Sequence, residues 1–301
     1  MEYKSRSKPR ELRILECLNR RMTLSSNDRM RLLKLKKGFE GERRFDFYTN
    51  KLDCDCLILN DLLLKINHTL FQIDSLIISD KLVYFYEIKN FEGDYLVDSD
   101  KFYKMPQTEI INPLFQLGRT ESLLRQFLQS YGFSLPTEAH LVFVNPEFTL
   151  YQSPLNKPIL FASQLNRYFS NFNKIPSQIG EKQKKLAETL LSQHIDDSPL
   201  SDLPPYQYHQ LRKGITCLRC YSFDVTTVRK KCICDTCGYA CDLNNVVIES
   251  VIELKLLFPK LKVTTSLVHE WCKGIESKYI IRQIMNSNFT KKGKQRWVYY
   301  K

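Results

Sequence analysis

Apolar residues recur three or four positions apart in several stretches of the chain, and this spacing predicts helices. The predicted helices are residues 9–22, 27–48, 114–131, 163–172, 181–194, 247–258, 265–273 and 277–287. The last residues of Thr23–Asp28 suit the N-cap of the second helix, and Asn112-Pro113 opens the third, because Asn caps well and Pro fits the first helical position. We expect Leu117, Leu124, Phe127 and Leu128 to form the buried stripe of that third helix.

Runs rich in β-branched and aromatic residues predict strands between these helices. Phe71–Ile78 and Leu82–Asn90 flank the polar turn Ser79-Asp80-Lys81, which predicts a β-hairpin. Gly93 lets the chain turn on into a third strand, and Glu138–Val144 predicts the next one. The expected core is therefore a βββαβ unit preceded by a helix, with helices on both faces of its sheet.

The register of the hairpin decides which polar side chains meet. If its loop has an even number of residues, Ile78 pairs with Val83 or Ser79 pairs with Leu82. In either case the cross-strand partner of Asp74 is Glu87. Lys89 lies two residues further on and shares their face. Two facing carboxylates need compensation, and hard oxygen ligands suit Mg²⁺ or Mn²⁺. The alternative is a surface Glu-Lys pair beside an unrelated Asp.

Four ordered motifs resemble those of the NERD (nuclease-related) domain, a branch of the PD-(D/E)XK nuclease superfamily. They are Gly38-Phe39-Glu40-Gly41-Glu42, Gln72-Ile73-Asp74, Glu87-Ile88-Lys89-Asn90 followed by Gly93, and Asn112-Pro113-Leu114-Phe115-Gln116. The resemblance covers about residues 38 to 150. Ile73-Asp74 stands where the superfamily has Pro-Asp, and this leaves the acid in place.

The resemblance implies an α/β restriction-endonuclease-like core, a mixed central sheet flanked by helices, and a Mg²⁺- or Mn²⁺-dependent deoxyribonuclease. Asp74 and Glu87 would bind the metal with the Ile88 carbonyl as a further ligand, and Lys89 would orient the attacking water. The resemblance also assigns Glu42 and Gln116 to the catalytic pocket. Glu40 can take the place of Glu42, because the sequence does not determine the helix phase, and Gly38 and Gly41 permit close approach of that helix to the sheet.

The implied setting is DNA processing or antiviral defence against invading DNA. A hypothesis from another class is a catalytically inactive DNA-binding or adaptor protein that uses the nuclease fold as a platform. The retained acids and lysine argue against it.

The net charge of the chain also indicates a nucleic-acid partner. The chain has 301 residues and a net charge of +12, which favours DNA or another polyanion. Basic residues are concentrated at both ends, although Lys and Arg also form ordinary solvated faces. No apolar run approaches the roughly 18 residues that span a bilayer, so we expect a cytoplasmic protein without a membrane partner. The sequence does not distinguish a monomer from a homo-oligomer or a complex with a protein partner.

The spacing of the cysteines predicts a structural zinc site. Cys217-Leu218-Arg219-Cys220 and Cys234-Asp235-Thr236-Cys237 are two knuckles separated by thirteen residues, the pattern of a zinc ribbon in which four thiolates hold Zn²⁺. Cys232 and Cys241 can exchange with an assigned ligand. Such a ribbon would depend on its metal for folding.

The last segment resembles a winged-helix module, with three helices followed by a hairpin that turns at Lys292-Gly293. The predicted DNA-binding residues are Lys278, Arg282, Lys291, Lys292, Lys294 and Arg296. The alternative is a helical cap on the ribbon that makes a protein contact. The expected domains are basic N-terminal helices at 1–37, the nuclease-like domain at 38–195, a linker at 196–211, the zinc ribbon at 212–246 and the basic module at 247–301.

Overall fold

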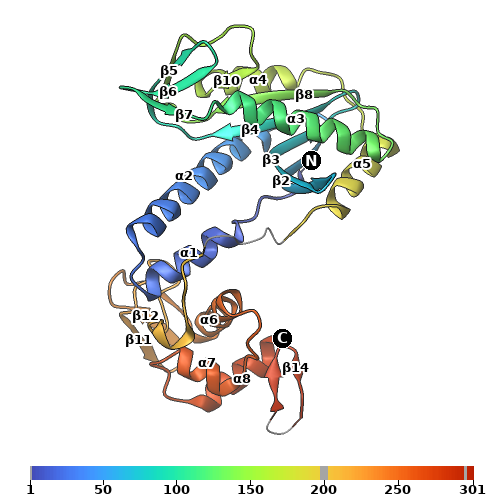
Figure 1. The fold of residues 1–301 in the computed structure, drawn as a ribbon. Coiled ribbons are helices and arrows are strands. Elements are labelled where there is room, and N and C mark those ends of the chain that lie inside the picture. The colour runs from blue at the N-terminus through green and yellow to red at the C-terminus, as the bar shows by residue number, and fades with distance from the viewer. Residues whose placement is uncertain (1, 197–202, 295–296) are drawn as a thin grey trace. The chain divides into compact units, whose positions relative to one another are not determined.

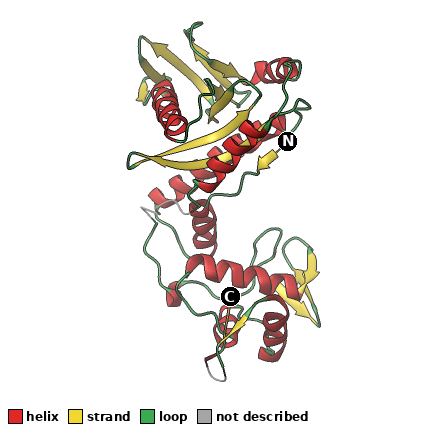
Figure 2. Ribbon diagram, turned by 90° about the vertical axis from the view of Figure 1, so that its right-hand side faces the viewer, coloured by secondary structure: helices red, strands yellow, loops and turns green. Residues whose placement is uncertain are grey.

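The computed structural model describes residues 2–196, 203–294 and 297–301. The chain divides into two compact units (Figures 1 and 2). Unit 1 contains Met1–Pro9 and Leu33–Ser201, and unit 2 contains Arg10–Leu32 and Asp202–Lys301. Part of the expected linker at 196–211 lies outside the described residues. The predicted DNA-binding residue Arg296 also lies outside them.

The centre of unit 1 is a six-stranded sheet with the order β1-β2-β3-β4-β8-β10. The strands are Glu2–Lys4 (β1), Leu57–Ile66 (β2), Thr69–Ile78 (β3), Val83–Lys89 (β4), Thr137–Phe143 (β8) and Ile159–Phe161 (β10). The sheet is mixed, because β3 is antiparallel to both β2 and β4, whereas β1 is parallel to β2, and β8 is parallel to both β4 and β10. The predicted mixed sheet is confirmed.

Helices cover both faces of this sheet, as predicted. They are Ser26–Thr49 (α2), Pro113–Ser130 (α3), Ala162–Phe172 (α4) and Glu181–Ser192 (α5). One core contains apolar side chains of α3 and α5, and its α3 members are the predicted Leu117, Leu124, Phe127 and Leu128. The other core joins Phe45 of α2 and Phe169 of α4 to the opposite face of the strands. The sheet is thus enclosed, which holds the ends of β3 and β4 in fixed positions.

The predicted third strand is the main error in the expected topology. The residues that follow the hairpin do form a strand, β5 (Gly93–Asp98). This strand lies in a second sheet with the order β7-β6-β5-β9. The other members of that sheet are Lys101–Lys104 (β6), Thr108–Ile110 (β7) and Phe148–Tyr151 (β9). Gly93 has a φ of +88° and turns the chain out of the central sheet.

The third antiparallel strand of the core is β2, which the sequence pattern did not reveal. Its apolar residues face both cores, so they do not alternate with polar ones in the way that marks a half-buried strand. Asn60 and Asp61 also interrupt the run, and Asp61 has a φ of +54°, which breaks the regular pleat. Asn60 is fully buried and accepts a hydrogen bond from Ser75 Oγ on β3 at 2.8 Å.

The second helix approaches the sheet through only one of its two glycines. A Cβ atom at Gly41 would lie 2.4 Å from Asn90 Cβ, so the helix fits there only with glycine. A Cβ atom at Gly38 would meet nothing within 4 Å, and the expectation of close approach at that residue is wrong. The helix begins at Ser26, and Ser25 Oγ caps it by accepting from Asp28 N at 3.1 Å, earlier than the expected cap.

Unit 2 contains a small sheet, helices and a short hairpin. The antiparallel sheet has the strands Val225–Val228 (β11), Lys231–Cys234 (β12) and Ala240–Asp242 (β13). The helices are Arg10–Arg21 (α1), Leu243–Leu257 (α6), Thr265–Trp271 (α7), Lys278–Asn288 (α8) and the 3-10 turn Tyr208–Gln210 (η1). The hairpin pairs Lys291–Lys292 (β14) with Tyr299–Tyr300 (β15).

The first helix belongs to unit 2 although it comes early in the chain. Arg21 at its end is enclosed, with its side chain 0% exposed, and forms an ion pair with Glu253 of α6 at 2.5 Å. The same guanidinium lies over the ring of Trp271 at 4.1 Å from the centroid. Long-range contacts thus join residues 10–32 to the C-terminal helices.

Candidate active site and cysteine cluster

The β3–β4 hairpin has the predicted register. Ile78 pairs with Val83 and Ser75 pairs with Tyr86, so the next opposed positions are Asp74 and Glu87. The backbone ladder ends there, and the Asp74 Oδ2 atom accepts a hydrogen bond from the Ile88 amide at 2.8 Å. An aspartate side chain thus takes the place of a backbone acceptor where the strands separate, which fixes the carboxylate beside Glu87.

Lys89 and Gln116 meet Glu87 on the same face. The Lys89 ammonium donates to Glu87 Oε1 at 2.7 Å and to Gln116 Oε1 at 3.0 Å. Glu87 is 2% exposed, whereas the Lys89 side chain is 21% exposed. Gln116 projects from the first turn of α3, where Asn112 accepts from the Leu114 amide at 3.0 Å. The structure therefore brings these three predicted residues together.

The structure decides between the two glutamates of α2 that the sequence left open. Glu42 is partly buried and lies close enough to Asp74 for that carboxylate to raise its pKa. Glu40 is exposed and lines a separate hollow with Lys36 and Arg44. The helix phase therefore places Glu42, and not Glu40, beside the acids of the hairpin.

Sequence reasoning missed an arginine in this cluster. Arg6 donates to Glu42 Oε2 at 2.8 Å and, through two nitrogens, to Asp46 at 2.9 and 3.0 Å. Its side chain is 3% exposed. No motif or periodicity marks Arg6, because it reaches the acids from a non-helical segment far away in the sequence. One indication in the sequence that a cation could bind here is that Asp46 lies one helical turn after Glu42, so both acids are on the same face of the helix.

Burial disfavours the charged forms of these carboxyls. It raises the pKa of Glu87 to about 7; the neighbouring Asp74 adds to this effect, and Lys89 acts against it. Burial and Asp74 likewise raise the pKa of Glu42 to about 8, against the effect of Arg6. Burial also raises the pKa of Asp74, although its hydrogen bond from Ile88 acts in the opposite direction. Negative charge here is incompletely compensated by the protein's own cations.

A divalent cation fits this donor set. Asp74 and Glu87 offer the hard oxygen atoms that Mg²⁺ prefers, and Mg²⁺ typically takes one or two carboxylates and completes its shell with water and phosphate. Glu42, Asp74 and Glu87 do not form a group of three whose ligand atoms all lie within 4.8 Å. The arrangement therefore suits two protein carboxylates on the metal, with Glu42 further out.

The pKa shifts lead to a prediction for the metal-free protein. The folded protein keeps protons on Glu42 and Glu87 at a pH where the unfolded chain, with a glutamate pKa of about 4.3, has released them. The free energy of unfolding of unit 1 should therefore fall by more than about 1 kcal/mol as the pH rises from about 4.5 to 8. Adding Mn²⁺ at pH 8 should restore it.

Thermal unfolding across this pH range, with and without Mn²⁺, measures the effect. Glu87→Gln should flatten the pH dependence, and Glu109→Gln on β7, which removes an exposed carboxylate, should not. A free energy of unfolding that rises over this range in the wild-type protein would contradict the prediction.

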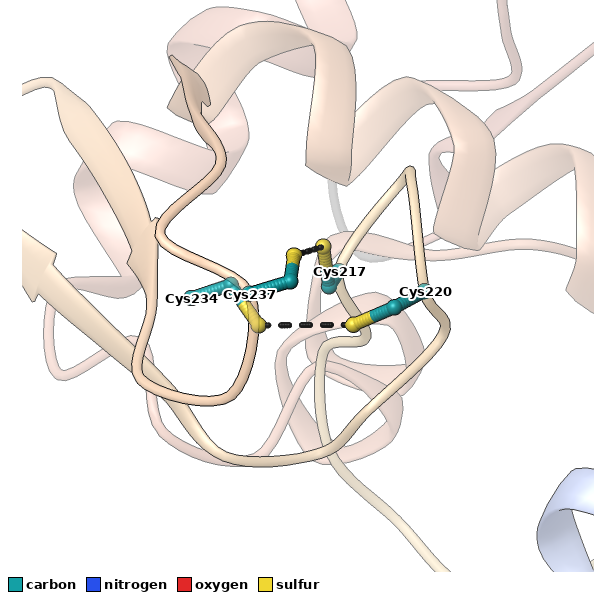
Figure 3. Close-up of side chains that lie close together, drawn as sticks. All are labelled: Cys217, Cys220, Cys234 and Cys237. Carbon is teal, nitrogen blue, oxygen red and sulfur yellow. Dashed lines mark hydrogen bonds between the residues drawn. The ribbon is translucent and has the colours of Figure 1, made fainter.

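The four predicted cysteines form a second cluster, in unit 2. The Sγ atoms of Cys217, Cys220, Cys234 and Cys237 all lie within 4.8 Å of one another (Figure 3). The sulfur atoms of Cys217 and Cys237 are 3.7 Å apart, and those of Cys220 and Cys234 are 3.5 Å apart. Among the described residues, this is the one group of three or more His, Cys, Asp or Glu that is close enough to share a metal ion.

The two spare cysteines lie outside this group. Cys232 and Cys241 pair across β12 and β13. Four thiolates with no open position suit structural Zn²⁺. Of the cysteines that the sequence offered, those whose sulfur atoms lie close enough to share an ion are Cys217, Cys220, Cys234 and Cys237.

The predicted DNA-binding residues that the structure describes lie on α8 and on the hairpin segment that follows it. Lys278, Arg282 and Lys291 line a hollow of about 520 Å³ together with Thr264 and Thr265. Lys292 and Lys294 are exposed. Gly293 has a φ of +83°, and a Cβ atom there would lie 2.2 Å from the Trp297 carbonyl oxygen, so the predicted turn requires glycine.

Within the described parts of the chain, no helix combines the length and the apolar character required to cross a bilayer. No curated protein and no solved structure matches the chain. One family model does match: NERD, the nuclease-related domain, at residues 37–144. That segment contains the whole β3–β4 hairpin and extends to the end of β8. Residues 37–144 are therefore similar to a nuclease-related domain, and Glu42, Asp74, Glu87, Lys89 and Gln116 all lie within that segment.

Proposed function

We propose that the protein is a metal-dependent nuclease that hydrolyses DNA phosphodiester bonds. One observation carries the proposal. Within the segment that matches a nuclease-related domain, Lys89 bridges Glu87 and Gln116 beside the half-buried Asp74. A merely solvated Glu-Lys pair would not have its carboxylate 2% exposed and opposed to a second acid.

Each of these residues has a proposed role. Asp74 and Glu87 hold Mg²⁺ or Mn²⁺, with the Ile88 carbonyl as a further ligand. When bound, the metal lowers the pKa of a water molecule and polarises the phosphoryl oxygen. Lys89 orients the attacking water and balances the charge that develops on the phosphate in the transition state.

The remaining polar groups position the lysine and the acids. The Gln116 amide oxygen accepts from Lys89, which holds the ammonium on the open side of Glu87. Glu42 assists from α2, where it lies close to Asp74. Because Lys89 keeps its partial exposure while Glu87 is enclosed, the ammonium is the group that a phosphate would reach first.

We propose that unit 2 grips the DNA. Its cysteine cluster would hold Zn²⁺ and stabilise the ribbon, and α6, α7, α8 and the β14–β15 hairpin would act as a winged helix. The hollow beside α8 supports this role, because Lys278, Arg282 and Lys291 line it and none of its described lining residues is acidic. Such a protein would act in DNA processing or in defence against invading DNA.

Cleavage assays on plasmid, linear and single-stranded DNA test the proposed activity. The protein should cleave at least one of these substrates with Mg²⁺ or Mn²⁺, and the product pattern should distinguish cutting within a strand from cutting at its end. Glu87→Ala and Lys89→Ala should both remove the activity. Cleavage that persists in both variants would refute the assignment.

The hairpin cations lead to a prediction about binding. Replacing Lys291, Lys292, Lys294 and Arg296 with Ala in the full chain should weaken binding to unrelated DNA sequences by similar factors, because phosphate contacts do not distinguish bases. Each lost contact should also lower the slope of log K against log salt by about 0.9. Fluorescence anisotropy at several salt concentrations measures both quantities.

A matched control removes the same number of exposed cations from unit 1, namely Lys174, Lys182, Lys184 and Lys185. We expect a smaller loss of affinity and a smaller change of slope in that variant. An unchanged affinity and slope in the hairpin variant would instead assign the module to protein contacts.

A further inference from the structure

Arg6 is an almost fully enclosed cation in the middle of the acidic site. It lies outside residues 37–144, the segment that matches the nuclease-related domain. In addition to its bonds to Glu42 and Asp46, its NH2 group donates to the Asp74 carbonyl oxygen at 2.8 Å. The Arg6 guanidinium therefore joins the helix α2 to the backbone of Asp74.

The N-terminal strand delivers this arginine. β1 pairs in parallel with β2 at the edge of the sheet. Lys4 holds the segment in place by donating to the Asn60 and Asp61 carbonyl oxygens at 2.7 and 2.8 Å. Asp61 Oδ1 in turn accepts from Gln72 of β3 at 2.9 Å. The segment is thus fixed on the strands that lead to Asp74.

The geometry uses the shape of the guanidinium and not only its charge. Glu42 and Asp46 are four residues apart and therefore lie on one face of α2. A planar fork can donate to both carboxylates and to a carbonyl at once, whereas an ammonium is a point charge that cannot hold all three in this geometry. Enclosing these ions costs desolvation energy, which offsets much of their attraction. The network is therefore weak evidence that Arg6 only stabilises the fold.

We propose that Arg6 is a positioning residue of the active site, which fixes Asp74 relative to Glu42 so that the carboxylates of the hairpin are preorganised for a divalent cation. The inference rests on the proposed nuclease function. Arg6 acts through Asp74 and touches neither the DNA nor the cation. Groups that orient metal ligands typically change metal affinity or activity by about 10- to 100-fold when they are removed.

Binding of Mn²⁺ alone to the full-length protein, followed by calorimetry, is the first test. Arg6→Ala should weaken Mn²⁺ binding by about tenfold or more. Arg6→Lys should recover only part of the affinity, and millimolar ethylguanidinium should restore Arg6→Ala towards the wild type. Lys184→Ala, which removes a cation from an exposed pair with Glu181, should leave the affinity unchanged.

Cleavage kinetics give the second test. Arg6→Ala should lower kcat by about tenfold or more while KM for DNA stays within about twofold, because Arg6 touches no substrate. Should Arg6→Ala fail to fold, Asp46→Asn weakens the same contact while leaving the guanidinium in place. It should give a smaller loss of the same kind.

The outcomes separate the two proposals. A folded Arg6→Ala protein with wild-type Mn²⁺ affinity would overturn the inference, and so would full recovery of that affinity in Arg6→Lys. If the wild-type protein binds Mn²⁺ but cleaves no DNA, the proposed function fails, and the loss of Mn²⁺ affinity in Arg6→Ala still supports the positioning role.

Discussion

Asp74→Asn and Glu87→Gln should each reduce DNA cleavage by about a thousandfold or more while DNA binding stays intact or becomes stronger. The two carboxylates are the proposed metal ligands, and an amide is a poor substitute for a charged oxygen donor. Binding is expected to survive, because removing a negative charge that faces phosphate costs no phosphate contact. Both replacements keep the shape of the side chain.

Cleavage rates and binding constants measured on the same preparations test this prediction. Glu109→Gln on β7 serves as the control, since it removes an exposed carboxylate from the same unit. Its rate should match that of the wild type. If both Asp74→Asn and Glu87→Gln stay active in protein free of contaminating nuclease, these acids do not hold a catalytic metal.

Removing the cysteine cluster should have the second large effect. Changing both Cys217 and Cys220 to Ser should abolish the binding of one Zn²⁺ per chain and unfold the ribbon of unit 2. Structural zinc sites supply about 10–16 kcal/mol of apparent binding energy at neutral pH, which is also folding energy. The two cores that enclose the central sheet contain no residue of the ribbon, so that sheet should remain folded.

Metal analysis of protein purified without chelator measures the zinc content, and circular dichroism measures what remains folded. The matched control changes Cys232 and Cys241 to Ser, because they pair across β12 and β13 outside the cluster. That variant should keep its zinc. The absence of zinc from the wild-type protein would contradict the assignment of a zinc ribbon.

Local patterns predicted the parts of the site that depend on neighbouring residues. Alternation and the short turn at Ser79–Lys81 were enough to give the register that opposes Asp74 and Glu87, because the chain between them is short. The Asn112-Pro113 signal located the first turn of α3 and thus Gln116. The spacing of the cysteines likewise predicted which four sulfur atoms meet.

Parts of the fold that depend on distant residues were not predictable in this way. β2 joins the sheet through residues that face two cores, so its pattern lacks the alternation of a half-buried strand. β5 has that alternation but pairs elsewhere, since backbone conformation at Gly93 and pairing with β9 decide its sheet. Arg6 reaches Glu42 across a separation of 36 residues, and no local rule reports such a contact.

The most direct test of the proposed activity is a metal titration of DNA cleavage by the wild-type protein. Protein freed of loosely bound divalent ions, with its zinc retained, would be mixed with supercoiled plasmid and increasing Mg²⁺ or Mn²⁺. We expect no product without added metal and a rate that rises to saturation as the metal is added. A folded, zinc-containing protein that binds the plasmid but never cleaves it at any metal concentration would contradict the nuclease function and favour a DNA-binding platform.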